Sequence, residues 1–399
     1  MTSTFLPIPG LRLGCTAAGI RYQGRNDLVA IELAAGSTCA AVFTRNAFCA
    51  APVVVAREHL GRVAPRYLVI NSGNANAGTG DAGLVAAREG CRLVAAAAGC
   101  SPEEVLPFST GVIGEPLRVE RIGAAAAALL ADLTDDGWER AADAIMTTDT
   151  VRKLVSREVP VGTGSIRVTG MAKGAGMICP DMATMLAYVA TDAAVAPALL
   201  QRCLEEAVEP SFNAITVDGD TSTNDACVLV ATGGSGLVVD RADSVEGGAL
   251  FDAVRDVCTA LARAIVKDGE GATKLVEILV EEAADRGEAR AVAYTIAHSP
   301  LVKTALFASD PNWGRILAAV GRAGLRDLEI RGVRIWLDAV QIVREGGRDP
   351  GYTEAAGKAV VARPEFTIRV ALGRGDVAAR VLTCDLSFDY VKINAEYRT

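Results

Sequence analysis

The most informative part of this 399-residue sequence is Gly170-Met-Ala-Lys-Gly-Ala-Gly-Met-Ile-Cys-Pro-Asp-Met-Ala-Thr-Met-Leu-Ala-Tyr-Val-Ala-Thr-Asp192. Glycines punctuate its first half, which carries Lys173 and ends at Pro180, and a strand pattern over residues 185–190 begins directly after Thr184. The pattern places a hydroxyl-bearing, β-branched residue at the start of a strand, behind a loop of wide backbone freedom. Composition alone favours a plain interpretation, a buried loop with a solvated lysine and a threonine that merely begins a strand.

Strand-like and helix-like patterns alternate on both sides of this stretch. An apolar run at 66–70 opens onto a loop-like segment at 71–78, and helices are expected at 81–98, 118–133, 136–146 and 248–267, with strands at 275–282 and 366–372. This order favours α/β or α+β layers. No internal repeat is present, and no linker marks a domain boundary.

Composition narrows the class of protein. The chain has 40 Lys and Arg against 48 Asp and Glu, a net charge of −8, and half of its residues are apolar. A disordered chain is excluded, the length fits two or three domains or one large α/β body, and the acidic balance argues against a nucleic-acid partner. The longest apolar run, 124–131, is far shorter than the roughly 20 residues of a membrane span, and residues 1–5 lack a secretory pattern, so we expect a cytoplasmic protein.

Histidine and cysteine usage restricts the chemistry. Only His59 and His298 are present, which rules out a His-rich metal site, and both are expected to serve in packing or at the surface. The ten cysteines form no C-x-x-C pair, so free thiols are expected rather than disulfides or a zinc site. Cys179 as a nucleophile would need one of the two histidines nearby and is set aside, as are a phosphate loop at 269–274 and a calcium loop at 218–225.

Several motifs resemble one family in order along the chain. They are Phe108-Ser-Thr-Gly-Val-Ile-Gly114, Ile145-Met-Thr-Thr-Asp-Thr150, Lys173-Gly-Ala-Gly-Met177, Met182-Ala-Thr-Met-Leu186, Val217-Asp-Gly-Asp-Thr-Ser-Thr-Asn-Asp225, Lys267-Asp-Gly-Glu-Gly-Ala-Thr-Lys274, Asp310-Pro-Asn-Trp-Gly-Arg315 and Asn394-Ala-Glu-Tyr. They resemble the ornithine acetyltransferases, the bifunctional glutamate N-acetyltransferase family of arginine biosynthesis. The resemblance covers nearly the whole chain. It implies an α/β fold with a layered α-β-β-α body and a smaller C-terminal α/β portion.

The resemblance also implies self-cleavage between Ala183 and Thr184. The products would be residues 1–183 and 184–399, pieces of 183 and 216 residues that stay together, two of each. Cleavage would expose an α-amino group on Thr184 itself, and because the pKa of such a group is about 7.7–8.0, it can act as the local base. A threonine activated in this way needs no histidine. Cys179 and Asp181, which depart from the family pattern near the cut, put the cleavage rate in doubt.

Site roles follow by position from the same resemblance. Thr110 and Gly111 match the oxyanion-hole pair, and Thr184 matches the nucleophile. The substrate-contacting positions match Thr147, Lys173, Thr184, Glu270, Asn394 and Thr399. A lysine and a glutamate suit the carboxylate and amine of acetylornithine or glutamate. Taken singly, each of these residues also has a plain structural interpretation, such as a helix end, a surface ion pair or a frayed tail.

The function implied is transfer of an acetyl group from N-acetylornithine to glutamate, by a ping-pong route through an acetyl ester on Thr184. No metal or cofactor is implied, and the sequence does not decide whether acetyl-CoA also serves as a donor. Two alternatives remain open. One is an N-terminal-nucleophile amidohydrolase or aminopeptidase that passes the acyl group to water, and the other is an uncleaved metabolite-binding protein.

Overall fold

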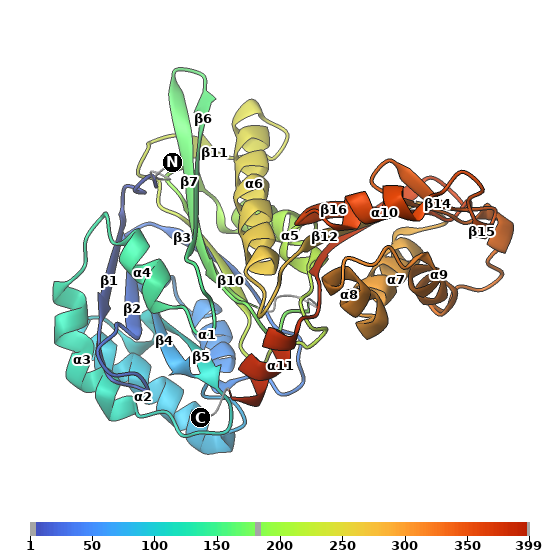
Figure 1. Ribbon diagram of the computed structural model, residues 1–399. Helices are drawn as coiled ribbons and strands as arrows, with labels where there is room; N and C mark the ends of the chain where they lie inside the picture. Colours follow the sequence, from blue (N-terminus) through green and yellow to red (C-terminus); the bar gives the residue numbers. More distant parts are fainter. Residues whose placement is uncertain (1–4, 180–184, 397–399) are drawn as a thin grey trace. The chain divides into compact units, whose positions relative to one another are not determined.

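The computed structural model describes residues 5–179 and 185–396, which form two compact units (Figure 1). The first unit comprises Met1–Asn213 and Asp220–Ile265, and the second comprises Ala214–Gly219 and Val266–Thr399. The main boundary falls inside helix α6 (Val245–Lys267). The sequence showed no boundary there because the chain passes from one unit to the other as a continuous helix, without a change in composition. The two pieces expected from cleavage do not coincide with these units.

The first unit contains two larger β-sheets. One has the order β1-β2-β4-β5, with β1 (Leu11–Thr16), β2 (Leu28–Leu33), β4 (Tyr67–Asn74) and β5 (Val105–Val112). The other has the order β3-β10-β8-β7-β6, with β3 (Thr38–Phe43), β10 (Ala226–Ala231), β8 (Leu186–Thr191), β7 (Gly164–Lys173) and β6 (Lys153–Val161). Two short strands, β9 (Ala194–Val195) and β11 (Val238–Val239), form a small parallel pair.

An apolar core fills the space between the two sheets. Phe108 of β5 meets Tyr188 of β8 there with its ring edge-on, at a centroid distance of 5.4 Å. A second core lies on the other face of β4, where Val69 packs with side chains of α1 (Ala51–Leu60), α2 (Gly80–Ala98) and α3 (Val119–Ala131). Helices α5 (Pro197–Val208) and α6 cover the outer face of the second sheet. The unit is therefore a layered α-β-β-α body, as predicted.

Most local elements follow the sequence pattern. Helix α2 ends where expected, because Gly99 adopts φ = 67° and can take the left-handed conformation that stops a helix. The loop expected at 71–78 is partly wrong, since strand β4 continues to Asn74. Its polar side chains find buried partners: Asn71 Oδ1 accepts from Ser109 Oγ at 2.6 Å, and Ser72 Oγ donates to the carbonyl of Ala144 at 2.8 Å. Satisfied in this way, they can be buried in a strand. Ala144 is the last residue of the short helix α4 (Trp138–Ala144).

The second unit is the smaller α/β portion that the sequence predicted. Its mixed sheet has the order β15-β14-β13-β16-β12-β17, with β12 (Leu275–Ala283), β13 (Arg334–Leu337), β14 (Val340–Arg344), β15 (Gly347–Arg348), β16 (Glu365–Ala371) and β17 (Val377–Cys384). Alternate residues of β12, β13 and β16 share one core with helices α7 (Arg286–Ala297), α8 (Pro300–Phe307), α9 (Trp313–Gly321) and α10 (Glu354–Val361). Helix α11 (Phe388–Ala395) ends the described part of this unit.

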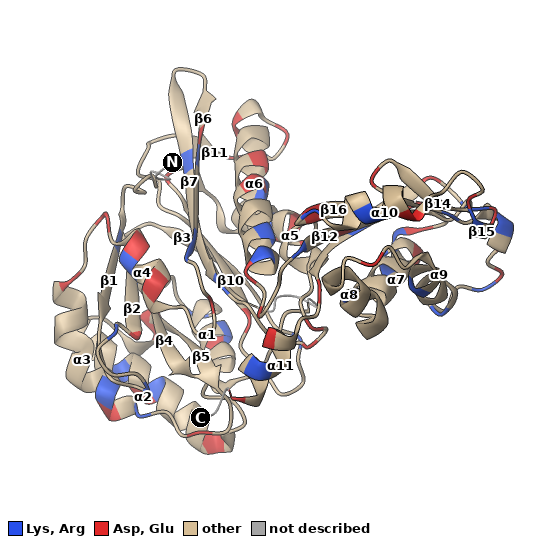
Figure 2. Cartoon of the chain, viewed as in Figure 1, with Lys and Arg blue, Asp and Glu red and all other residues tan. Residues whose placement is uncertain are grey.

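Figure 2 shows that Lys and Arg positions alternate with Asp and Glu positions along the elements of both units. Among the described residues, no helix is both long and apolar enough to cross a membrane.

Candidate active site

The carboxyl end of β5 brings Thr110 and Gly111 to the edge of the first sheet. Gly111 lies opposite Gly73 in the β4–β5 pairing, at a bulge where Asn74 pairs with both neighbours of Gly111. Its φ is 134°, and a Cβ there would lie 2.2 Å from the carbonyl carbon of Gly73. Only glycine fits this position, because a side chain would be strained and would also collide with backbone.

Lys173, the last residue of β7, reaches Thr110. Its Nζ donates to Thr110 Oγ1 over 2.9 Å, although the two residues are 63 positions apart in sequence. A lysine ammonium can only donate, so Thr110 Oγ1 is the acceptor of this bond and its own O–H remains able to donate elsewhere. Thr110 thus has the hydrogen-bond polarity that an oxyanion donor needs.

Thr147 is connected to the same place through a residue that the sequence did not single out. Asp149 accepts hydrogen bonds from the backbone N–H of Thr147 at 3.0 Å, the backbone N–H of Gly174 at 2.6 Å and Lys153 Nζ at 2.6 Å. Gly174 directly follows Lys173. The side chains of Asp149 and Lys153 are fully buried.

The charges around Asp149 keep its carboxylate ionised. Burial alone would raise the pKa of Asp149, but the charges of Lys173 and Lys153, with the bonds from Lys153 and Gly174, lower that pKa below its usual value. One carboxylate therefore interacts with the charges of two lysines, Lys153 and Lys173.

The start of β8 lies between the ends of two neighbouring strands. Its first residue, Leu186, pairs with Lys173 of β7 on one side and with Ala226 of β10 on the other. The N–H of Ala226 donates to the carbonyl of Met185 at 3.0 Å. Because Thr184 is bonded to Met185 in the chain, the predicted nucleophile is one peptide bond away from this described contact.

Asp225, which directly precedes β10, is buried and unusual. Burial raises the pKa of its carboxyl well above the usual value, although Ser222 and the charge of Lys173 act in the opposite direction. Its Oδ2 has no hydrogen-bond partner among the described residues. The surroundings of this carboxyl therefore favour its protonated form, and the next residue, Ala226, pairs with Leu186 at the start of β8.

Asn224 links the second sheet to β5. Its Nδ2 donates to the carbonyls of Ala75 at 2.6 Å and Ser109 at 3.0 Å, and its Oδ1 accepts from Thr223 Oγ1 at 2.6 Å. Strand β5 is an edge strand, so one side of its backbone has no neighbouring strand in the sheet. Asn224 provides the hydrogen-bond donor for one backbone group of this strand, the carbonyl of Ser109, which directly precedes Thr110.

Two further predicted residues lie together in the second unit. Asn394 Nδ2 donates to Glu270 Oε2 over 2.7 Å. The loop that carries Glu270 is fixed to the residues around α11, because Ser387 Oγ donates to the carbonyl of Gly271 at 2.6 Å. Asp385 holds the same loop by accepting from the N–H of Thr273 at 2.8 Å.

The structure thus brings the predicted residues into two groups, each within its own unit. Thr110, Gly111, Thr147 and Lys173 form one, and Glu270 with Asn394 forms the other. Ala183, Thr184 and Thr399 lie outside the described residues, as does Asp181. Their roles, like those of the other site residues, stay predictions.

The residues that the sequence analysis missed are Asp149, Lys153, Asn224 and Asp225. Asp149, Asn224 and Asp225 stand inside motifs that were quoted there, so position in a motif was an available signal. For Lys153 there was no such signal, because a lysine at the start of a strand is ordinarily exposed.

Both histidines are engaged in packing, as predicted. His59 Nδ1 pairs with the carbonyl of Val105 at 2.9 Å, and His298 Nε2 pairs with Thr216 Oγ1 at 3.1 Å. All ten cysteines are free.

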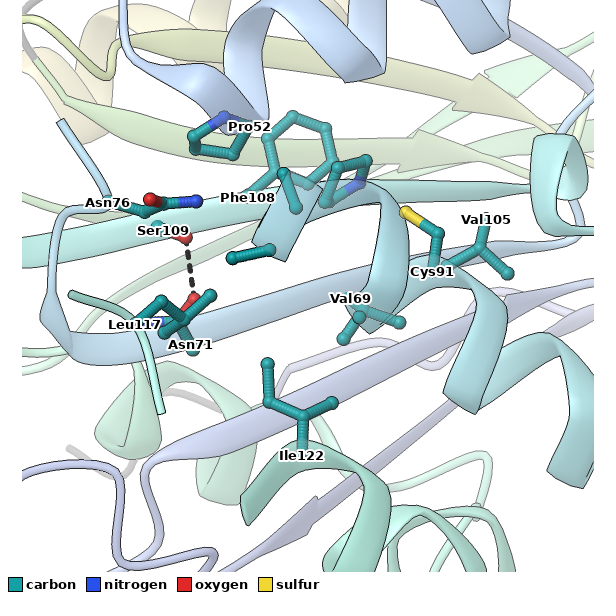
Figure 3. Close-up of a pocket in the computed structure, with 14 residues that line it drawn as sticks. Pro52, Val69, Asn71, Asn76, Cys91, Val105, Phe108, Ser109, Leu117 and Ile122 are labelled. Atoms are coloured by element: carbon teal, nitrogen blue, oxygen red, sulfur yellow. Dashed lines mark hydrogen bonds between the residues drawn. The ribbon is translucent and has the colours of Figure 1, made fainter. Parts of the chain in front are cut away.

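A mostly apolar cavity lies between β4, β5 and helices α1, α2 and α3 (Figure 3). Phe108, Cys91 and Ile122 are among its lining residues, and its polar lining includes the hydrogen-bonded pair Ser109 and Asn71. Thr110, Thr147 and Lys173 are not among the lining residues. The cavity is therefore separate from the group of predicted site residues.

Comparison with known proteins gives consistent matches. The ArgJ family model matches residues 12–399. The arginine biosynthesis bifunctional protein ArgJ of Methylococcus capsulatus is 62% identical over 393 residues, which are 98% of this chain and 96% of that protein. The protein of the same name from Psychrobacter arcticus is 56% identical over 397 residues, 99% of this chain and 98% of that protein. A crystal structure of the bifunctional protein ArgJ from Bacillus halodurans matches with a TM-score of 0.51 and 37% identity, covering 53% of this chain and 99% of that chain.

Proposed function

The chain belongs to the ArgJ family, and from this premise we propose how its residues transfer an acetyl group from N-acetylornithine to glutamate. It is an acyltransferase of arginine biosynthesis, like the relatives it resembles over nearly its whole length. The proposal concerns the residues, the cleavage and the substrates.

The observation that carries the proposal is the bond from Lys173 Nζ to Thr110 Oγ1, which leaves the Thr110 hydroxyl able to donate beside Gly111. In the first half-reaction, Thr184 Oγ attacks the acetyl carbonyl of N-acetylornithine and gives its proton to the α-amino group of Thr184. The Thr110 hydroxyl and the Gly111 N–H stabilise the oxyanion, a contribution of about 3–4 kcal/mol for one such donor. The C–N bond then breaks, and ornithine leaves with the proton.

The second half-reaction runs the same steps with glutamate. Its amine attacks the acetyl ester, the ester C–O bond breaks, and Thr184 Oγ regains a proton as N-acetylglutamate leaves. In the first unit, the ammonium of Lys173 suits the α-carboxylate of either substrate. In the second unit, the carboxylate of Glu270, with Asn394, suits an amine. Thr147 and Thr399 complete the proposed contacts.

Self-cleavage between Ala183 and Thr184 provides the amine that this route needs. The two pieces would stay joined, because β7 pairs with β8 across the cut and β3 pairs with β10. An assembly with two of each piece, and acetyl-CoA as a second donor, are further parts of the proposal.

The test combines mass spectrometry with an acetyl-transfer assay. Denaturing mass spectrometry should show pieces of 183 and 216 residues, and acetylornithine should add one acetyl group to the larger piece. Thr184→Ala should remain one chain without activity, whereas Thr184→Ser should still cleave. An intact, active 399-residue chain would refute the mechanism.

The assay also separates the alternatives. An amidohydrolase would consume acetylornithine at a rate that does not depend on glutamate. A metabolite-binding protein would be one uncleaved chain before any substitution, and Thr184→Ala would leave its ligand affinity unchanged.

A further inference from the structure

Asp149 occupies a position that the proposed reaction does not yet explain. It lies in the loop between α4 and β6, and its buried carboxylate accepts three hydrogen bonds, two from residues within four positions and one from Gly174, 25 positions away. Two come from backbone N–H groups, at Thr147 and Gly174, and the third comes from Lys153. A surface ion pair would not need such a set of donors.

These donors connect the 147–149 loop to the end of β7. The N–H of Gly174, the residue that follows Lys173, and the ammonium of Lys153, the first residue of β6, donate to the same oxygen of Asp149. The backbone directly after Lys173 is therefore anchored to the carboxylate of Asp149. The direction in which the Lys173 side chain leaves β7 depends on that anchor.

The position of Lys173 matters for the polarity of Thr110. As long as Lys173 Nζ donates to Thr110 Oγ1, the Thr110 hydroxyl proton must point to another acceptor. If Lys173 moved away, that hydroxyl could turn and donate to a group other than the oxyanion. A displaced anchor would thus reduce transition-state stabilisation more than substrate binding.

We propose that Asp149 is a positioning residue for acetyl transfer, which holds the end of β7 so that Lys173 keeps the Thr110 hydroxyl available to the oxyanion. This inference rests on the proposed function. Lys153 has a different task, because it neutralises a carboxylate that would otherwise be buried without a partner.

The test compares two variants that break the same ion pair. Asp149→Asn places an NH2 group where one carboxylate oxygen stood, and because an NH2 group cannot accept, one backbone N–H loses its partner. Lys153→Met leaves both backbone bonds to Asp149 in place. Both variants should unfold at a lower temperature than the parent. Asp149→Asn leaves the buried ammonium of Lys153 without its carboxylate, and Lys153→Met leaves the buried carboxylate of Asp149 without that ammonium.

The rate of acetyl transfer should distinguish Asp149→Asn from Lys153→Met. Per molecule of cleaved enzyme, we expect Asp149→Asn to lower kcat by tenfold or more with KM changed less than threefold, and Lys153→Met to keep kcat within threefold. The rate of acetyl-Thr184 formation, measured by rapid quenching and mass spectrometry, should fall in parallel with kcat.

A double-mutant cycle tests whether the effect passes through Lys173. In a Lys173→Met background, Asp149→Asn should lower kcat by less than threefold further. Should Asp149→Asn fail to fold, Asp149→Asn/Lys153→Met, which removes both charges of the ion pair, takes its place. Equal kcat values for Asp149→Asn and Lys153→Met would overturn this inference and leave the proposed function standing. The same holds if the losses of kcat in Asp149→Asn and Lys173→Met are additive in the double variant. Parent enzyme that forms no acetyl-Thr184 would overturn the proposed function, and the inference with it.

Discussion

Lys173 and Thr110 join the two sheets of the first unit: Lys173 ends β7 in one sheet, Thr110 stands near the end of β5 in the other, and 2.9 Å separates Nζ from Oγ1. The bond lies beside the point where β8 begins, since Leu186 pairs with Lys173. A change in either residue therefore alters the junction of the sheets as well as the oxyanion donor.

The Thr110 hydroxyl can be tested with a pair of substitutions. Thr110→Val removes the hydroxyl at nearly constant shape, so kcat should fall by about 100-fold to 1,000-fold, the usual loss for one oxyanion donor. Thr110→Ser keeps the hydroxyl and should retain kcat within about tenfold. Steady-state kinetics on cleaved enzyme provides the measurement, and equal kcat values for the two variants would argue against the assigned role.

Gly111→Ala should be far more damaging than the same change at Gly114. Both glycines have a positive φ, 134° and 84°, but a Cβ at Gly111 would lie 2.2 Å from the backbone of Gly73, whereas no atom lies within 4 Å of a Cβ at Gly114. Gly114→Ala should cost about 1–2 kcal/mol of unfolding free energy, the penalty of the left-handed conformation. Gly111→Ala should lose more stability and nearly all activity, as denaturant unfolding and kinetics would show. Similar losses at both positions would mean that crowding at Gly111 is unimportant.

Asn224 should stabilise the contact between the second sheet and β5. Asn224→Asp places an oxygen against the carbonyls of Ala75 and Ser109, which both lose their donor. We expect the free energy of unfolding to fall by about 2–4 kcal/mol, since each buried unsatisfied group costs about 1–3 kcal/mol. Thr223→Val is the matched control, because it removes only the bond to Asn224 Oδ1 and should cost less. Chemical denaturation measures both, and a smaller loss in Asn224→Asp than in the control would refute this assignment.

Asp225 should make the protein less stable as the pH rises. Its folded-state pKa is raised by burial, while the unfolded value is about 3.9. Between these two values the folded chain holds a proton that the unfolded chain has lost, so the free energy of unfolding decreases with increasing pH. Asp225→Asn removes this dependence.

The variant should therefore gain stability relative to the parent at pH 7, and gain less at pH 4. Thermal or urea unfolding at the two pH values gives the comparison. A gain that is equal at both would show that Asp225 is not held as a neutral acid.

The sequence could predict the elements and their layers because both depend on local patterns. The spacing of apolar residues predicted the helix that is α6, and Gly99 predicted the end of α2. The loop expected at 71–78 was partly wrong for a reason outside that segment: Asn71 is bonded to Ser109, 38 residues away. Local composition indicates a polar segment and cannot show that its side chains find buried partners.

The motifs, and the scarcity of histidine, were enough to indicate a threonine-based acyl transfer and to name the residues for it. Only the folded chain shows that Thr110 and Lys173 are hydrogen-bonded, and that Asp149 and Asn224 hold the strands carrying them. Residue types and their order are properties of the chain itself. A hydrogen bond between residues 63 positions apart depends on how separate strands pair and how two sheets pack, and these are settled only when the core between them forms.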